Sequence, residues 1–178
     1  MASNHIEATA VVPFTRDELF NYLADLENHW ALADRFVEVV DLDREVTEHG
    51  LAPATGGRVR MRGPLGISRT ARTRMLAADA PNGMLGMAHL GRRTLAVVSW
   101  TLVDDTPGAL VGLRAEVVRA GALDRLLLAL GGRRWLERRF ASTLERLGDV
   151  IEPRAEARPG PQSPNTHREH PRQLKAAA

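Results

Sequence analysis

The apolar residues of this chain change their spacing once, close to residue 120, and that change limits the folds open to it. Before this point they alternate with polar residues in short segments, which is typical of β-strands with one buried face. After it they recur every three or four residues from about Ala122 to Ile151, which indicates a long amphipathic helix. Gly131 and Gly132 interrupt this pattern; because glycine disfavours a helix interior, they indicate a kink, or a place where the sheet or a ligand comes close to the helix. The chain is therefore predicted to adopt an α+β fold.

The alternating part of the chain predicts seven strands and one or two short helices. The first strand, 6–12, ends at Pro13, and Thr15 with Glu18 forms a capping box that opens a helix running to about Leu26. A short helical or irregular piece follows over 28–34. The remaining six strands are predicted at 36–43, 58–62, 67–77, 84–90, 94–103 and 109–118. Turns rich in glycine and proline separate most of them, so consecutive strands are expected to pair antiparallel.

The composition divides the chain into a folded domain, residues 1–152, and a tail, residues 153–178. The tail contains five prolines but no aromatic and no β-branched apolar residue, so it is expected to be disordered. It carries five basic and two acidic residues, and it therefore supplies the whole of the chain's net charge of +2. Since the domain itself is slightly acidic, the sequence pI of about 9.9 does not indicate a nucleic-acid partner.

Charge is unevenly distributed within the domain. Residues 1–57 hold three arginines and eleven acidic residues, whereas residues 58–93 hold eight arginines and one aspartate. Such asymmetry could mark a binding face, but two opposite blocks packed side by side would explain it equally well, and we favour that interpretation.

Several classes of protein are excluded by what the sequence lacks. Without cysteine there is no disulfide, no thiolate nucleophile and no cysteine-ligated metal. No HExxH, GxSxG, P-loop or GxGxxG motif occurs in the required context, so neither a metal nor a cofactor is expected. The longest strongly apolar stretch, 126–130, is too short to span a bilayer, and no signal peptide is evident, so a cytoplasmic location is expected.

Four stretches of sequence, taken in order, are more specific than any single motif. They are AVVPFTRDELFNYLADLENHW (10–30), RMRGPLGISRTARTRM (60–75), VSWTLVDDTPGALVGLRAEV (98–117) and LDRLLLALGGRRWLERRFASTLERLGDVIE (123–152). Their order resembles the helix-grip fold of the START-related SRPBCC superfamily, in particular its polyketide cyclase/dehydrase and lipid-transport branch. The resemblance implies a curved seven-stranded antiparallel sheet wrapped around a long C-terminal helix. It also implies an apolar cavity between them that binds lipids, polyketides or similar molecules.

The alternation of side chains along each strand predicts which residues line this cavity. Val59 and Met61 share one face of their strand, which leaves Arg58, Arg60 and Arg62 on the solvent side. The same reasoning, together with the large residues on the last helix and the resemblance, gives the full set of predicted ligand-binding residues. These are Trp30, Val59, Met61, Ile67, Arg69, Thr73, Met75, Met87, His89, Trp100, Leu113, Ala115, Leu126 and Leu130. Trp100 and Trp135 could serve as core residues or as ligand platforms, and we favour core packing for both.

A few polar residues could carry chemistry. Arg69 is expected on the same inward side of its strand as Ile67 and Thr73. An arginine on that side costs free energy unless it meets a carboxylate or a ligand anion. His89 could act as a general acid or base, with Arg69 and Asp34 as further candidates. His29, Glu27 and Asp34 surround Trp30 and could orient a polar ligand end, although helix capping and surface charge would also account for them.

Three functions are compatible with these observations. The leading hypothesis is a protein that binds, and carries or sequesters, a hydrophobic small molecule. The alternative is a polyketide cyclase or aromatase that uses the same cavity. A third is a docking module whose outward arginines and basic tail contact an anionic membrane surface or an acidic partner. The outward arginines are Arg58, Arg60, Arg62, Arg72 and Arg74.

Overall fold

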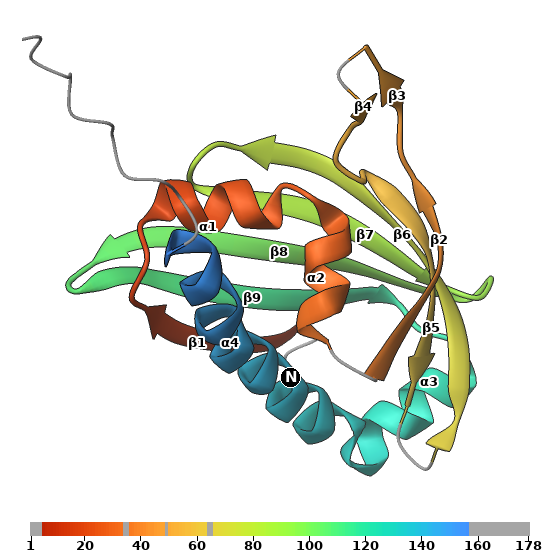
Figure 1. Cartoon of the computed structure of the whole chain (residues 1–178). Coiled ribbons are helices and arrows are strands. Elements are labelled where there is room, and N and C mark those ends of the chain that lie inside the picture. The colour runs from red at the N-terminus through yellow and green to blue at the C-terminus, as the bar shows by residue number, and fades with distance from the viewer. Residues whose placement is uncertain (1–4, 34–35, 49, 64–65, 157–178) are drawn as a thin grey trace, which may run out of the picture.

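The computed structural model describes residues 5–33, 36–48, 50–63 and 66–156, and Figure 1 shows their arrangement. The first part of the chain forms β1 (His5–Val12), α1 (Arg16–Leu23), α2 (Leu26–Leu32), β2 (Val37–Asp43), β3 (Val46–Thr47) and β4 (Gly50–Leu51). The second part forms β5 (Gly56–Arg62), β6 (Ser68–Asp79), β7 (Gly83–Leu90), β8 (Thr94–Asp105) and β9 (Gly108–Arg119). The C-terminal part forms α3 (Ala122–Leu127), the π-helical segment η3 (Leu128–Gly132) and α4 (Arg133–Glu156).

Seven of the strands form one antiparallel sheet, as the sequence predicts. The spatial order is β1-β9-β8-β7-β6-β5-β2, so each strand from β5 to β9 pairs with the next along the chain, while β1 and β2 occupy the two edges. The small hairpin of β3 and β4 is an addition that the sequence did not indicate. The helices α1, α2 and α4 lie on the same face of the sheet (Figure 1), so this face holds the core and any ligand cavity.

The first helices follow from their capping residues. The Thr15 side chain accepts a hydrogen bond from the backbone N–H of Glu18, and the Thr15 N–H donates to the Glu18 carboxylate, so the predicted capping box is confirmed. The helix ends at Leu23 rather than near Leu26. Asp25 then caps a second helix, α2, by accepting a hydrogen bond from the N–H of Glu27. This break turns α2 into a separate element that carries His29 and Trp30 over the sheet.

The second half of α4 anchors that helix to the rest of the fold. Leu144, Leu147 and Ile151 are buried in one core cluster together with Leu19 of α1 and Val12 of β1. Burying side chains of this size is the main favourable contribution to folding. The position of α4 across the sheet is therefore determined at its C-terminal half.

The predicted kink before α4 is present, and it changes which leucines face the sheet. Leu130 and Gly131 leave helical geometry inside η3, and Gly131 adopts a φ of 104°, which favours glycine. Leu126 and Leu130, which the uninterrupted pattern placed on the sheet side, are 55% and 75% exposed. The prediction that they form a cavity wall is wrong, because a helix broken at this point no longer continues the face of α4.

The last helix continues to Glu156, beyond the predicted domain boundary. Residues 153–156, which the sequence assigned to the tail, prolong α4, and the rest of the predicted tail lies outside the described residues. Among the described residues, no helix combines the length and the apolar character needed to cross a membrane.

The anchoring role of α4 can be tested by truncating one of its buried side chains. Leu147→Ala is expected to lower the free energy of unfolding by about 2–5 kcal/mol, because it leaves a cavity in a filled core. Leu123→Ala, at an exposed leucine of α3, is the matched control and should cost less than about 1 kcal/mol. Urea denaturation measures both values, and equal losses would contradict the assignment.

Candidate functional site

Two adjoining cavities lie between the sheet and the first half of α4. One, which we call the α2 cavity, has a volume of about 210 Å³ and reaches His29 and Trp30 of α2. The other, the α3 cavity, has a volume of about 240 Å³ and reaches Leu127 of α3 and Leu128 of η3. They share six wall residues: Phe36, Met61, Ala88, Val98, Leu136 and Phe140. Because one set of side chains borders both spaces, we treat them as a single elongated site.

The sheet leaves this space open because its inward side chains are small toward the α3 end. Ala88 pairs with Ala96 across β7 and β8, and Val98 pairs with Ala115 across β8 and β9. Toward the other end the corresponding positions are filled by Trp100 and its partners Met84 and Leu113, which belong to the core. Side-chain volume along the strands thus determines where the core ends and the cavity begins.

His29 is the most distinctive polar residue of the α2 cavity. Its Nε2 lies 2.6 Å from the carbonyl oxygen of Leu23, and its ring meets the Trp100 ring edge-on at a centroid distance of 5.2 Å. Burial lowers the pKa of His29 from 6.5 to about 4, although the Leu23 carbonyl and the charge of Asp25 act in the opposite direction. His29 is therefore neutral at pH 7. Since a carbonyl oxygen can only accept, Nε2 carries the proton and Nδ1 is a hydrogen-bond acceptor.

The acidic neighbours of His29 serve the fold. Asp25 and Glu27 both form ion pairs with Arg44, and Asp25 also accepts a hydrogen bond from the N–H of Ala54 at 3.1 Å. Burial acts to lower the pKa of Arg44, but its hydrogen bonds and charge interactions with Asp25 and Glu27 outweigh this and raise it. Asp25 thus anchors the loop before β5, and Glu27 holds Arg44 beside it. Asp34, a predicted catalytic candidate, lies outside the described residues.

Arg69 meets a carboxylate of the chain itself. Its guanidinium forms an ion pair with Asp124 of α3, and the hydroxyl of Thr94 donates a hydrogen bond to the same carboxylate. The N–H of Gly121 in turn donates to the Thr94 hydroxyl at 3.0 Å. The side chains of Arg69 and Asp124 are only 28% and 11% exposed, so this contact joins β6 to α3 inside the wall of the α3 cavity. We refer to it as the Arg69–Asp124 latch.

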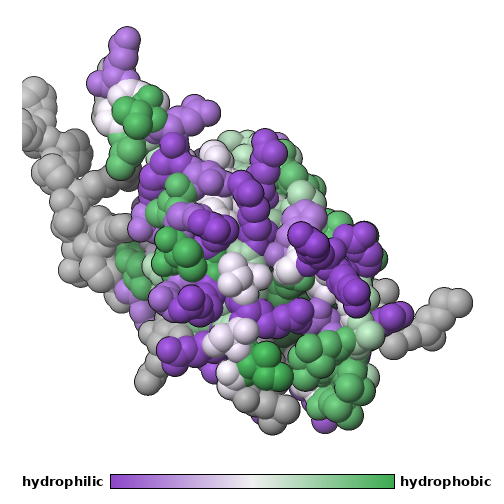
Figure 2. Space-filling model, turned by 90° about the vertical axis from the view of Figure 1, so that its right-hand side faces the viewer, coloured by the Kyte–Doolittle hydropathy of each residue, from purple (hydrophilic) through white to green (hydrophobic). Residues whose placement is uncertain are grey.

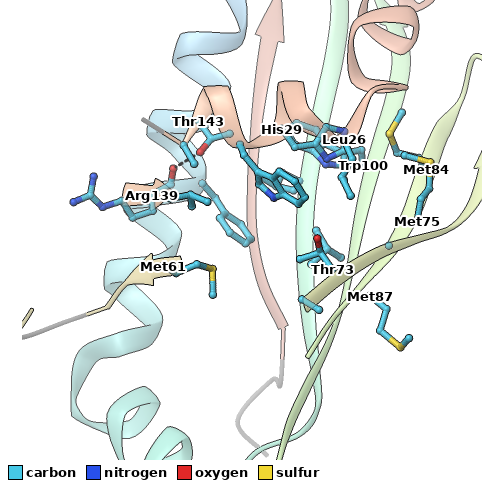
Figure 3. Close-up of a pocket in the computed structure, with 18 of the residues that line it drawn as sticks. Leu26, His29, Met61, Thr73, Met75, Met84, Met87, Trp100, Arg139 and Thr143 are labelled. Atoms are coloured by element: carbon cyan, nitrogen blue, oxygen red, sulfur yellow. Dashed lines mark hydrogen bonds between the residues drawn. The ribbon is translucent and has the colours of Figure 1, made fainter. Parts of the chain in front are cut away.

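The structure brings many of the other predicted residues together around the two cavities. Those that line them are Trp30, Met61, Ile67, Arg69, Thr73, Met75, Trp100, Leu113 and Ala115. Figure 3 shows several of these side chains in the α2 cavity. Met87 borders the same cavity, but its side chain points away from Thr73 and Trp100 in that view. Val59 is buried beside Trp30 and Ala71 in a separate core cluster.

His89 lies on the opposite face of the sheet from the cavities. On β7, His89 pairs in register with Arg72 of β6 and with Leu95 of β8. The residues on either side of it, Ala88 and Leu90, border the cavities instead. The alternation predicted for β7 is therefore off by one residue: the side predicted to face the cavity faces outward. Glycine and alanine, which occupy the inward positions, carry a weaker hydrophobic signal than the leucine and methionine on the other side.

Some cavity residues were missed by the sequence reasoning. Leu136, Phe140 and Thr143 of α4 line the α2 cavity, and their spacing of four and three residues along the helix was the signal that could have revealed them. Phe36 stands edge-on to Trp135 at a centroid distance of 4.8 Å, with the Arg139 guanidinium 4.9 Å from the centre of the Phe36 ring. No comparable signal pointed to Phe36, which lies just before β2.

The two oppositely charged blocks of the sequence pack against each other on the far face of the sheet. Arg58 pairs with Asp41, Arg60 with Glu38, and Arg72 with Asp43, all between the arginine-bearing strands and β2. The hydrogen bond from Arg58 lowers the pKa of Asp41, and the same contact raises the pKa of Arg58. Figure 2 shows the hydrophilic surface that results. We call the outward side of β5 and β6, which carries Arg58, Arg60, Arg62, Arg72 and Arg74, the arginine face. Three of these five charges are thus paired with acidic residues of the same chain.

The polar groups of the site do not form a metal centre. Among the described residues, no three histidine, aspartate or glutamate side chains come together in a way that could hold an ion. The polar atoms bordering the cavities instead come from isolated groups, such as His29 and Thr73, and from the latch.

Comparison with known protein families identifies the group to which this arrangement belongs. The sequence model of the polyketide cyclase/dehydrase and lipid transport family matches residues 3–152. The chain belongs to this family. No functionally curated protein matches it.

Solved structures share the fold at low sequence identity. Protein TTHA0849 from Thermus thermophilus is 16% identical with a TM-score of 0.60, over 85% of this chain and 99% of that one. Protein Ms6760 from Mycobacterium smegmatis is 15% identical with a TM-score of 0.58, over 85% of this chain and 93% of that one. DynU16, a protein of the dynemicin biosynthetic locus, is 14% identical with a TM-score of 0.54, over 84% of this chain but only 48% of its own length.

The buried His29 predicts a stability change at mildly acidic pH. The unfolded chain takes up a proton near pH 6.5, whereas the folded chain does so only near pH 4, so falling pH favours unfolding between these values. His29 should account for about 2 kcal/mol of lost stability between about pH 7 and pH 5. Urea denaturation of the wild type and of His29→Gln measures this, and the variant should lack that part of the loss. His89→Gln, on the other face, should retain it.

The Arg69–Asp124 latch predicts strong coupling between two residues. Arg69→Met leaves Asp124 without its cation and should lower the free energy of unfolding by about 1–3 kcal/mol. Combining it with Asp124→Asn should cost clearly less than the sum of the two single changes. A double-mutant cycle measured by denaturation checks this, and simple additivity would show that the pair does not act as a unit.

Proposed function

We propose that this protein binds a hydrophobic small molecule in the elongated site formed by the α2 and α3 cavities, and that it carries or sequesters that molecule. The observation that carries the proposal is a pair of adjoining apolar spaces, of about 210 and 240 Å³, beside a filled core. Taken jointly, their volume suits the usual range for small-molecule sites, about 300–1,000 Å³. Membership in a family described by polyketide chemistry and lipid transport supports the same class of ligand.

The walls suggest the chemistry of the ligand. Most of the lining is aliphatic or aromatic, so affinity would come from the burial of apolar surface. The few polar groups, with His29 foremost, would fix its orientation. Since neutral His29 offers an acceptor at Nδ1, a ligand with an apolar body and one hydroxyl or other donor group fits best.

A cyclase reaction has less support from these contacts. Of the three catalytic candidates, His89 faces away from the cavities, Arg69 is engaged by Asp124, and Asp34 lies outside the described residues. His29 remains as a possible proton acceptor, but its lowered pKa makes it a weak base at neutral pH. The occurrence of DynU16 in a biosynthetic locus is a property of that protein, whose structure shares only the fold with this one. We therefore place binding ahead of catalysis.

The binding proposal can be tested by filling the shared wall. Ala88 borders both cavities, so Ala88→Leu should weaken binding of the apolar fluorescent probe N-phenyl-1-naphthylamine by about tenfold or more. Ala77→Leu, at an exposed position of β6, is the matched control and should leave the affinity unchanged. Fluorescence titration measures the dissociation constants.

Native mass spectrometry of the purified protein complements this titration. A co-purified fatty acid, sterol, quinone or polyketide would identify the ligand class. If the wild type bound neither the probe nor any member of these classes, the proposed function would be wrong.

A further inference from the structure

The outward face of α3 and η3 exposes leucines that the fold does not use. Leu123, Leu126 and Leu130 are 52%, 55% and 75% exposed, although they lie within a few residues of one another. Isolated exposed leucines are common, but three on one short segment form a local apolar patch. Figure 2 shows hydrophobic side chains gathered at the lower end of the molecule, the end at which α3 lies in Figure 1.

Three arginines close to this patch have no acidic partner among the described residues. Arg119, Arg125 and Arg133 line one shallow groove beside η3, and within the part of the chain that the structure describes none of them forms an ion pair. The acidic residue of α3, Asp124, is turned inward and neutralised by Arg69. This patch therefore differs from the arginine face of β5 and β6, where acidic residues of β2 pair with several of the arginines.

We propose that the α3–η3 patch, defined by Leu123, Leu126, Leu130, Arg119, Arg125 and Arg133, docks on the surface of an anionic lipid membrane. Leucines on one side of a helix can enter the boundary between headgroups and acyl chains, while neighbouring arginines bind lipid phosphates. Unpaired positive charge next to exposed leucines complements such a surface. A protein partner would instead be expected to require a broader complementary face.

The position of the patch connects it with the cavity. Leu127 and Leu128, on the inward side of the same segment, form part of the wall of the α3 cavity. A membrane held against the outward side would therefore lie one helix thickness from the ligand site. This inference rests on the proposed function, because it names the place where a lipid-like ligand is exchanged.

Vesicle flotation with the full chain tests the docking. Vesicles of phosphatidylcholine with about 30% phosphatidylglycerol should bind the wild type at about 50 mM salt, and binding should weaken at about 500 mM salt. The triple change of Leu123, Leu126 and Leu130 to serine should reduce the bound fraction at least tenfold. Serine at Val11 and Val103, exposed apolar residues of β1 and β8, is the control and should leave binding intact.

The arginines are tested in the same way. Changing Arg119, Arg125 and Arg133 to glutamine should weaken binding by about fivefold for each residue. Changing Arg60, Arg62 and Arg74 on the arginine face removes the same charge and should have a much smaller effect. Because every variant keeps the basic tail, equal losses in the two sets would show that overall charge, and not this patch, drives binding.

A label on the patch provides a second measurement. The chain has no cysteine, so Leu130→Cys accepts a single environment-sensitive fluorophore, with Val103→Cys as control. Only the label at residue 130 should shift to the blue when anionic vesicles are added. Absence of binding by the wild type at low salt, or binding unchanged by the leucine variant, would overturn the docking proposal. Either result would leave the proposed function standing, provided that the probe still binds the cavity.

Discussion

The burial of Leu144, Leu147 and Ile151 against β1 and α1 is the packing on which the rest of the structure depends. It holds the C-terminal half of α4 to a filled core, so the N-terminal half spans the remaining part of the sheet. At that end the inward side chains of the sheet are small, and the helix therefore covers a space that it does not fill. The C-terminal half of α4 thus packs in the core, while its N-terminal half borders the cavities.

The polar groups around that space have separate roles. The latch between Arg69 and Asp124 satisfies two charges within a mostly apolar wall and ties α3 to β6, so it contributes to the shape of the site. His29 has one ring nitrogen committed to the backbone and a pKa low enough to keep it neutral, which leaves it able to accept a hydrogen bond. The ligand that we propose, an apolar molecule with one donor group, would match a mostly apolar wall with one acceptor.

The arginines of the chain also divide into two groups. Those on β5 and β6 face acidic residues of β2, and their pairing explains why two highly charged blocks can share one domain. Among the described residues, those close to α3, Arg119, Arg125 and Arg133, have no such partner, and exposed leucines lie on the same segment. The groove that these three arginines line adjoins the α3 cavity at Leu128.

The sequence by itself determined the order of the strands along the chain, the capping box at Thr15, the kink at Gly131 and the family resemblance, because each depends on residues close together in the chain or on element order. Only the tertiary structure decided that Arg69 meets Asp124, that His29 and not His89 lines the cavity, and that Leu126 and Leu130 face outward. Periodicity records neighbours along the chain. It cannot identify a distant ionic partner, it loses the phase of a strand whose inward residues are glycine and alanine, and it cannot follow a helix face through a kink.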